Sequence, residues 1–238
     1  MRIFLGVVAC SLLACAGAGF DDGQAPDGAA GGDWTARFSV DQEEWLSSGK
    51  NPYFILEPGY RLVLREGDEE LTITVLGETR MVDGIETRVV EERETRGGHL
   101  VEISRNYFAI CKRTDDVFYF GEDVDIYKDG AVVGHEGAWL AGVGEARPGL
   151  MMPGQPLLGS RYYQEVAPGV AMDRARIVSA STTLKTEAGE FRNCLVIEET
   201  TPLEPDAREQ KIFARGIGLL KDGSLTLVRH GMDESRDR

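Results

Sequence analysis

The sequence is poor in the residues on which most enzyme sites depend. Its three histidines, His99, His135 and His230, lie far apart and lack the paired spacing of zinc ligands. It contains no Gly-x-Ser-x-Gly motif, and none of its four cysteines has an obvious activating partner nearby in the sequence. The sequence therefore favours a non-catalytic protein over an enzyme.

Basic residues are scarce relative to acidic ones. The 238-residue chain has 26 Lys and Arg against 40 Asp and Glu, a net charge of −14. Because such a surface repels phosphate backbones, we expect no nucleic-acid partner. The 42% hydrophobic and 28% charged residues are an ordinary globular balance, which rules out disorder throughout and a multi-span membrane protein.

The chain begins with an apolar run, from Ile3 to Ala14 after Arg2, that is too short to span a bilayer and is typical of a secretion signal. It ends in Leu12-Leu13-Ala14-Cys15, which resembles the bacterial lipobox, where a cysteine is lipidated and becomes the new N-terminus. We predict a signal peptide over residues 1–14 and a lipid anchor on Cys15, with a plain secreted protein as the alternative.

The segment after the predicted anchor consists mostly of Gly, Ala and Asp. Residues 16–33 should form a flexible tether with an end-to-end distance of roughly 23 Å. By resemblance to sorting in Gram-negative bacteria, Ala16 favours the outer membrane. We therefore expect a domain over residues 34–238, held to the cell envelope by lipid and facing the periplasm or the cell surface.

The rest of the sequence is dominated by apolar–polar alternation of period two, which is typical of strands. With no long stretch of helical spacing, we expect one all-β antiparallel domain of about ten strands, a curved sheet, barrel or sandwich. We expect at most one or two short helices, with residues 41–48 as the candidate. Stretches 107–111 and 117–120 are apolar on both faces, so they should be buried on both sides. Tight turns are expected at three Asp-Gly pairs, at residues 83–84, 129–130 and 222–223.

The segment 135–160 is rich in Gly and Pro and interrupts the strand pattern. A long segment without strands inside a compact domain is either functional or a packed plug. Trp139, Leu150, Met151 and Met152 are the candidates for contact with an apolar ligand at the mouth of a cavity. The alternative is that these side chains plug an open end of the sheet.

A run of acids suggests a possible metal site. Glu122, Asp123, Asp125 and Asp129 offer the hard oxygen ligands that Ca²⁺ prefers, although Lys128 stands where an EF-hand loop needs glycine. The alternative is a solvated hairpin that deters strand addition. Apart from this Ca²⁺, the sequence indicates no cofactor.

Other acids lie on predicted strands beside arginines. Cross-strand ion pairing explains them without acid–base chemistry. They are Glu91, Glu92, Glu94, Glu198 and Glu199.

Two cysteines, Cys111 and Cys194, remain once Cys10 and Cys15 are assigned to the signal and the anchor. In an oxidising compartment such a pair tends to form a disulfide. The alternative is two buried free thiols that pack as small apolar residues.

Several short motifs resemble a widespread group of uncharacterised bacterial exported proteins. They cover residues 51–220: Asn51-Pro52-Tyr53-Phe54 with Leu56 and Pro58-Gly59, Tyr119 to Asp123, Trp139 to Gly142, Pro148 to Pro153, Tyr163 to Glu165, Thr201 to Pro205, and Gly216 with Gly218. The chain departs from the group at Ile110-Cys111, where polar residues are common. The resemblance implies an exported β-protein and no particular activity.

The sequence as a whole favours a lipid-anchored envelope protein that binds an apolar ligand or an envelope partner, by analogy with half-barrel lipid carriers. The alternatives are a metal-dependent hydrolase that uses the acids of residues 115–129, and a structural envelope component without a ligand.

Overall fold

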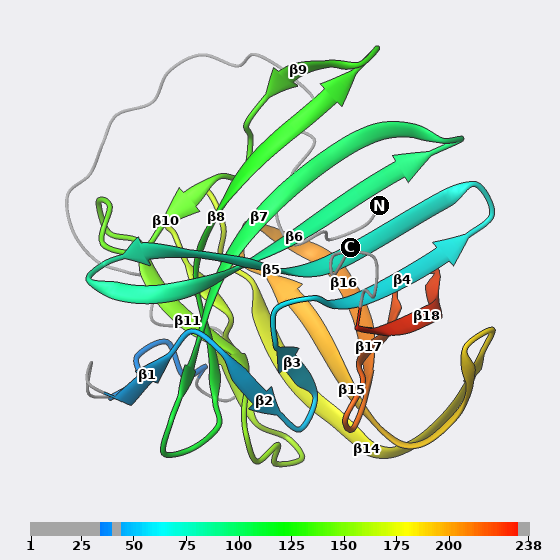
Figure 1. The fold of residues 1–238 in the computed structure, drawn as a ribbon. Helices are drawn as coiled ribbons and strands as arrows, with labels where there is room; N and C mark the ends of the chain where they lie inside the picture. Colours follow the sequence, from blue (N-terminus) through cyan, green and yellow to red (C-terminus); the bar gives the residue numbers. More distant parts are fainter. Residues whose placement is uncertain (1–33, 40–43, 233–238) are drawn as a thin grey trace.

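The computed structural model describes residues 34–39 and 44–232 (Figure 1). The predicted signal peptide, Cys15 and the whole tether of residues 16–33 lie outside the described residues. The described chain is all-β, as predicted, with no α-helix. It forms one 16-stranded antiparallel sheet and a separate two-stranded hairpin. Within the described ranges, no helix has the length and apolar character needed to cross a membrane.

The strands follow one another along the chain with short connections. Their bounds are β1 Trp45–Leu46, β2 Gly49–Asn51, β3 Phe54–Leu56, β4 Tyr60–Glu66, β5 Glu69–Val82, β6 Ile85–Arg96, β7 His99–Cys111, β8 Val117–Lys128, β9 Ala131–Gly134, β10 Trp139–Leu140, β11 Arg147–Met152, β12 Arg161–Tyr163, β13 Glu165–Val166, β14 Arg174–Thr186, β15 Gly189–Thr201, β16 Glu204–Ala214, β17 Gly218–Asp222 and β18 Leu225–Met232.

The large sheet curls into a nearly closed barrel (Figure 1). Its strand order is β12-β14-β15-β16-β17-β18-β4-β5-β6-β7-β8-β11-β13. The two strands at the ends of this path, β12 and β13, are separated in the chain by a single residue, Gln164. The Gln164 backbone N–H also donates to the Asp173 carbonyl oxygen at 2.8 Å. The sheet therefore returns to its starting edge at Gln164.

The structure corrects two details of the predicted strand pattern. It has more strands than the expected ten because several pairings involve only two to four residues. The helix expected over 41–48 is wrong for the described residues 44–48, which contain β1. Trp45 pairs with Cys111 of β7 and lies edge-on to Phe118 and Phe120, at ring distances of 5.0 and 5.3 Å. This tertiary packing overrides the weak local preference for a helix.

The Asp-Gly turns form where the sequence places them, with one shift. Asp83 and Asp129 have φ of 49° and 52°, and the glycine after each also has a positive φ, as a two-residue hairpin loop requires. At the third site Asp222 still pairs with Leu225, so the loop is Gly223-Ser224. Gly223 has φ of 56° at the first loop position, where a type II′ turn needs glycine.

The glycine-rich segment 135–160 is not strandless, because β10 and β11 pair with β8. Two glycines permit this close packing. A Cβ on Gly121 would lie 2.3 Å from the Trp139 carbonyl oxygen, and one on Gly149 would lie 2.3 Å from the Gln164 carbonyl carbon. These glycines therefore allow backbones to approach, and the segment completes the barrel wall.

One end of the barrel is covered by the hairpin β2–β3 (Figure 1). The fully buried Asn51 fixes this hairpin: its Nδ2 donates to the carbonyl oxygens of Asp115 and Met152, at 2.8 and 3.3 Å, and its Oδ1 accepts from the Tyr53 N–H at 2.7 Å. Stretches 107–111 and 117–120 are buried throughout, as predicted.

Candidate ligand cavity

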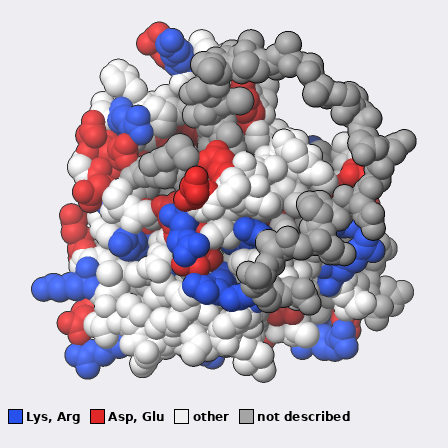
Figure 2. Space-filling model, turned by 180° about the vertical axis from the view of Figure 1, so that it is seen from behind, with Lys and Arg blue, Asp and Glu red and all other residues white. Residues whose placement is uncertain are grey.

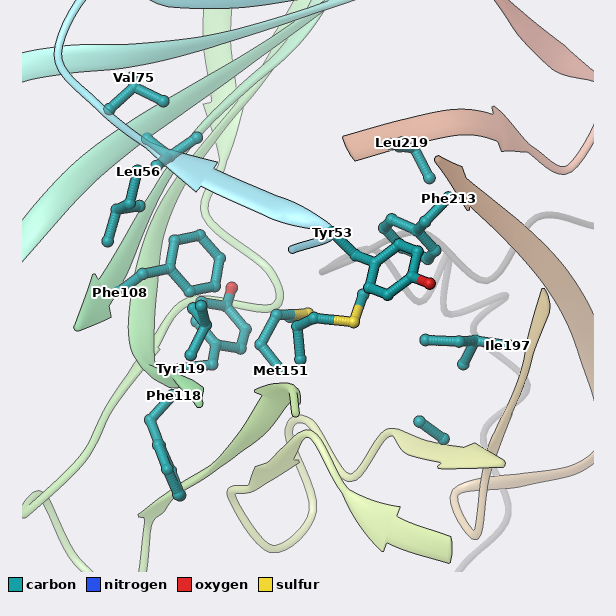
Figure 3. Packing of buried hydrophobic residues seen from close by; sticks show 14 of the residues in the cluster. Tyr53, Leu56, Val75, Phe108, Phe118, Tyr119, Met151, Ile197, Phe213 and Leu219 are labelled. Carbon is teal, nitrogen blue, oxygen red and sulfur yellow. The ribbon is translucent and has the colours of Figure 1, made fainter. Parts of the chain in front are cut away.

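A cavity of about 60 Å³ lies inside the barrel beneath the β2–β3 hairpin. Its walls are almost entirely apolar and come from opposite sides of the barrel, and Figure 3 shows Tyr53, Met151, Phe213 and Leu219 turned toward this interior. Other wall residues include Val75, Val90 and Phe108. Apolar walls with few polar groups are typical of small-molecule sites.

The cavity is small in the closed barrel. A cavity needs about 10–15 Å³ to hold one water molecule, so the 60 Å³ here has room for about four to six. An apolar cavity that holds benzene measures about 150 Å³, so a single ring or an alkyl chain of about six carbons enters this space only if the covering hairpin or the surrounding side chains move.

The polar part of the cavity is a buried ion pair between neighbouring strands. Lys211 Nζ, on β16, lies 2.9 Å from Glu199 Oε2 on β15, and both side chains are almost fully buried. Glu199 Oε1 also accepts a hydrogen bond from Gln164 Nε2 at 2.9 Å. Within the described chain no acceptor meets hydrogen-bond geometry at Nζ, so the contact with Glu199 is an ion pair.

More carboxyl groups surround Lys211 than one ammonium can neutralise. Asp222 is its direct cross-strand partner on β17, and Glu92 on β6 lines the same cavity. Burial lowers the pKa of Lys211, but Asp222 and Glu199 outweigh this effect and raise it above its ordinary value. Desolvation raises the pKa of Glu92 to about 7, although Lys211 partly opposes the shift. Lys211 is therefore firmly charged, whereas Glu92 titrates near neutral pH.

The excess of acid continues along the inside of the barrel. Desolvation, reinforced by Glu94 and Glu92, raises the pKa of Glu102 to about 8. Desolvation and then Glu199 raise the pKa of Asp173 to about 7. Burial also raises the pKa of Glu165 well above its usual range.

Glu122 is the most deeply buried of these acids. It is fully buried, and within the described chain neither of its carboxyl oxygens has a hydrogen-bond partner. Burial raises its pKa well above the usual range, and Glu92 and Glu102 add to the shift. The neighbouring Tyr119 hydroxyl donates its hydrogen bond to Asn106 Oδ1 at 2.6 Å, so it does not donate to Glu122. Burial therefore favours the neutral form of the Glu122 carboxyl group.

Of the four side chains predicted to contact a ligand, the structure places one in the cavity and three elsewhere. Met151 lines the cavity. Trp139 is buried with its ring edge-on to Tyr119 at 5.3 Å, outside the cavity lining. Met152 is fully buried in the core, and Leu150 lies in a shallow pocket with Thr35 and Phe38 on the other side of the sheet.

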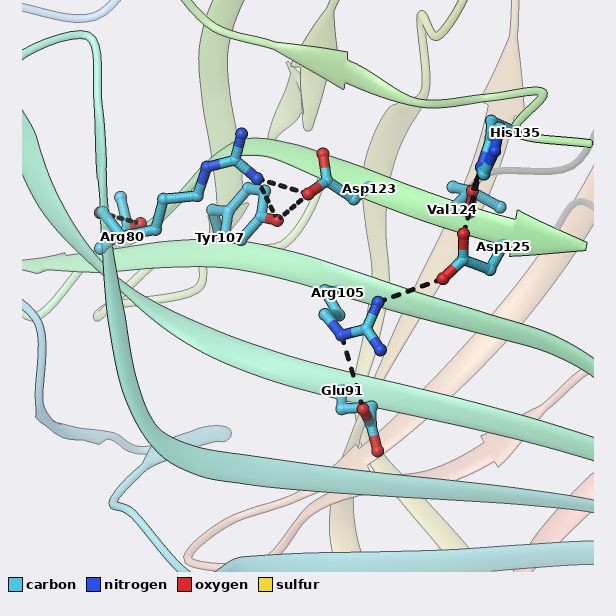
Figure 4. Close-up of polar contacts among 9 residues, drawn as sticks. Arg80, Glu91, Arg105, Tyr107, Asp123, Val124, Asp125 and His135 are labelled. Atoms are coloured by element: carbon cyan, nitrogen blue, oxygen red, sulfur yellow. Dashed lines mark hydrogen bonds and ion pairs between the residues drawn. The ribbon is translucent and has the colours of Figure 1, made fainter. Parts of the chain in front are cut away.

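The acids predicted to bind Ca²⁺ do not converge. Glu122 points into the barrel, whereas Asp123 and Asp125 lie on the opposite face of β8 (Figure 4). Asp123 pairs with Arg80 and accepts from the Tyr107 hydroxyl, and Asp125 pairs with Arg105 and His135, at 3.2 and 3.1 Å. Asp129 occupies the β8–β9 turn. No group of three or more potential metal ligands occurs among the described residues.

Cys111 and Cys194 are both buried and free in the structure. Their strands, β7 and β15, are not neighbours in the sheet. Cys111 Sγ lies 3.8 Å from Glu44 Oε2, and Cys194 Sγ lies 3.4 Å from the Phe191 carbonyl oxygen.

Cross-strand ion pairing explains only part of the predicted strand carboxylates. Glu198 pairs with Arg176 at 2.9 Å and Arg208 at 3.4 Å, on the outer face of the sheet. On the face of the molecule in Figure 2, acidic and basic side chains are interspersed.

Glu92 and Glu199 instead point inward, and the sequence analysis missed their role. The available signal was alternation, since Glu199 shares a face with Ile197 and Lys211 shares one with Phe213.

Comparisons of the chain with protein-family models, curated proteins and solved structures find no match. The candidate site is therefore defined by its own geometry: an apolar cavity with an acidic floor and one buried ammonium.

Proposed function

We propose that this protein is a lipid-anchored envelope protein that binds a small apolar ligand inside its barrel without catalysis. The observation that carries the proposal is the cavity: apolar walls from several strands meet over a polar floor of Glu92, Glu199 and Lys211. Buried charges are costly, and a core built only for stability gains more from apolar side chains of similar size. Ionic groups beside an apolar cavity are better explained by ligand recognition.

The two rival functions have less support. A hydrolase built on the acids of residues 115–129 needs them to converge, whereas Glu122 is buried and Asp123 and Asp125 lie on the opposite face of β8. A purely structural envelope component gives no reason for a cavity or for the inward-facing Glu92. Within the described chain, the ligand-binding role uses both features.

The location in the envelope is supported by the lipobox at Cys15 and by the short apolar run before it. An acylated Cys15 on an 18-residue tether would hold the barrel close to a membrane, facing the periplasm or the cell surface.

Mass spectrometry of the full chain purified from its own membrane tests both halves of the proposal. Under denaturing conditions we expect a chain that begins at Cys15 and carries covalent acyl groups. Under native conditions we expect an additional non-covalent small molecule. A Cys15→Ser variant should lose the covalent acyl groups and the new N-terminus at residue 15 but keep the non-covalent molecule. A chain that still begins with Met1 and carries a bare thiol at residue 15 would contradict the anchor, and a native chain without any adduct would contradict the bound ligand.

A further inference from the structure

The charge on the cavity floor restricts the kind of ligand that this site accepts. Glu92 and Glu199 line the cavity directly, and Asp222 lies opposite Lys211 in the sheet. Among the described residues that line the cavity, Lys211 is the only cation. If all three charged groups of the lining are ionised, two carboxylates share a single ammonium.

Lys211 is not available to bind an anionic ligand. Its side chain is 2% exposed, and its ammonium already lies 2.9 Å from Glu199, with Asp222 across the strand pair. A ligand carboxylate here would be a further negative charge in a poorly solvated space, where like-charge repulsion is strong.

Glu92 is the side chain that is free to contact a ligand. It lines the cavity, yet within residues 34–39 and 44–232 it makes no hydrogen bond or ion pair. The charges that act on it most strongly are the ammonium of Lys211 and the carboxylates of Asp222 and Glu199, so negative groups outnumber the single positive one around it. Glu122, a fully buried acid with no hydrogen-bond partner for either oxygen in the described chain, is also within electrostatic reach of Glu92.

We infer that the ligand of this cavity is an apolar amine, whose alkyl or aromatic part packs among Tyr53, Val75 and Phe213 and whose ammonium group contacts Glu92. This assignment rests on the proposed function and adds the chemical class of the ligand. The ammonium supplies the positive charge that the floor lacks and donates hydrogen bonds to a carboxylate, an arrangement stronger than a neutral pair. An alcohol of the same length makes only a neutral hydrogen bond, and a carboxylate is repelled.

Calorimetric titration with three probes of equal chain length tests the assignment: hexylammonium, 1-hexanol and hexanoate. The full chain carries Cys15→Ser so that no lipid or detergent competes for the probes. We expect hexylammonium to bind at least about tenfold more tightly than 1-hexanol, since hydrogen bonds to charged groups contribute more than neutral ones. We expect hexanoate to bind more weakly than 1-hexanol.

Two matched variants test whether Glu92 causes the preference for hexylammonium over 1-hexanol. Glu92→Gln should lower the ratio of hexylammonium to 1-hexanol affinity to near one. Glu91→Gln, one residue earlier on the same strand, should leave the ratio unchanged, because Glu91 faces outward toward Arg105. Preferred binding of hexanoate, or an unchanged ratio in Glu92→Gln, would overturn the amine assignment while 1-hexanol binding still supported a ligand site. Failure of all three probes to bind would contradict the proposed function and this inference together.

Discussion

Lys211→Met should destabilise the protein by about 3–5 kcal/mol, the usual cost of removing one member of a buried ion pair. The substitution conserves most of the side-chain volume, so the loss comes from the charge. It leaves Glu199, which accepts from Gln164, without the ammonium at 2.9 Å. Chemical denaturation of the full chain at pH 7 measures the effect.

Two further variants separate charge from packing. Lys185→Met removes a lysine from an exposed position of β14 and should change the unfolding free energy by less than about 0.5 kcal/mol. The double variant Lys211→Met/Glu199→Gln should recover part of the loss, because the carboxylate that lies 2.9 Å from the ammonium is then replaced by a neutral amide. A loss below about 1 kcal/mol for Lys211→Met would mean that Lys211 does not neutralise the cavity floor.

Thermal stability should fall as the pH rises from 5 to 8. Burial raises the pKa of Glu92 to about 7 and that of Glu102 to about 8, against a reference value of 4.5. Between the unfolded and the folded pKa, the folded chain holds protons that the unfolded chain has released. The stability from this difference is fully present below pH 4.5 and is lost as the pH rises through 7 to 8.

Scanning calorimetry of the full chain at four pH values between 5 and 8 measures this dependence. We expect the Tm at pH 8 to be lower than at pH 5 by at least about 5 °C. Glu102→Gln keeps the side-chain shape and should flatten the profile, whereas the outward-facing Glu91→Gln should not. A Tm that is constant or rises toward pH 8 would contradict the neutral state of the interior acids.

The sequence was sufficient to predict the class of the fold but not its closure. Period-two alternation identified the all-β class, and the predicted buried stretches 107–111 and 117–120 lie within β7 and β8. Alternation cannot detect strands of two or three residues such as β10, β12 and β13, which exist only because a partner strand lies beside them. The return of the sheet to its first edge at Gln164 depends on those short strands.

The site was predictable only in part. The sequence shows where acidic residues occur, but successive residues of a strand point to opposite faces of the sheet, so neighbouring acids can have different roles. Glu122 and Asp123 are adjacent in the chain, yet one is fully buried and the other pairs with Arg80 on the surface. Met151 was found as a cavity residue from the composition of its segment, whereas Lys211 was missed. Its burial depends on three carboxyl groups that lie on other strands.

Titration of 1-hexanol into cavity-filling variants tests most directly whether the barrel interior is a ligand site. Val75 is buried and lines the cavity, so Val75→Phe fills space that a ligand needs, and Val90→Phe does so from the next strand. Val133→Phe makes the same change at a position that is 60% exposed. We predict that 1-hexanol binds the parent chain and Val133→Phe with equal affinity and does not bind Val75→Phe or Val90→Phe, while all four chains melt cooperatively. Equal binding by the folded cavity-filling variants, or no binding by the parent chain, would contradict the account.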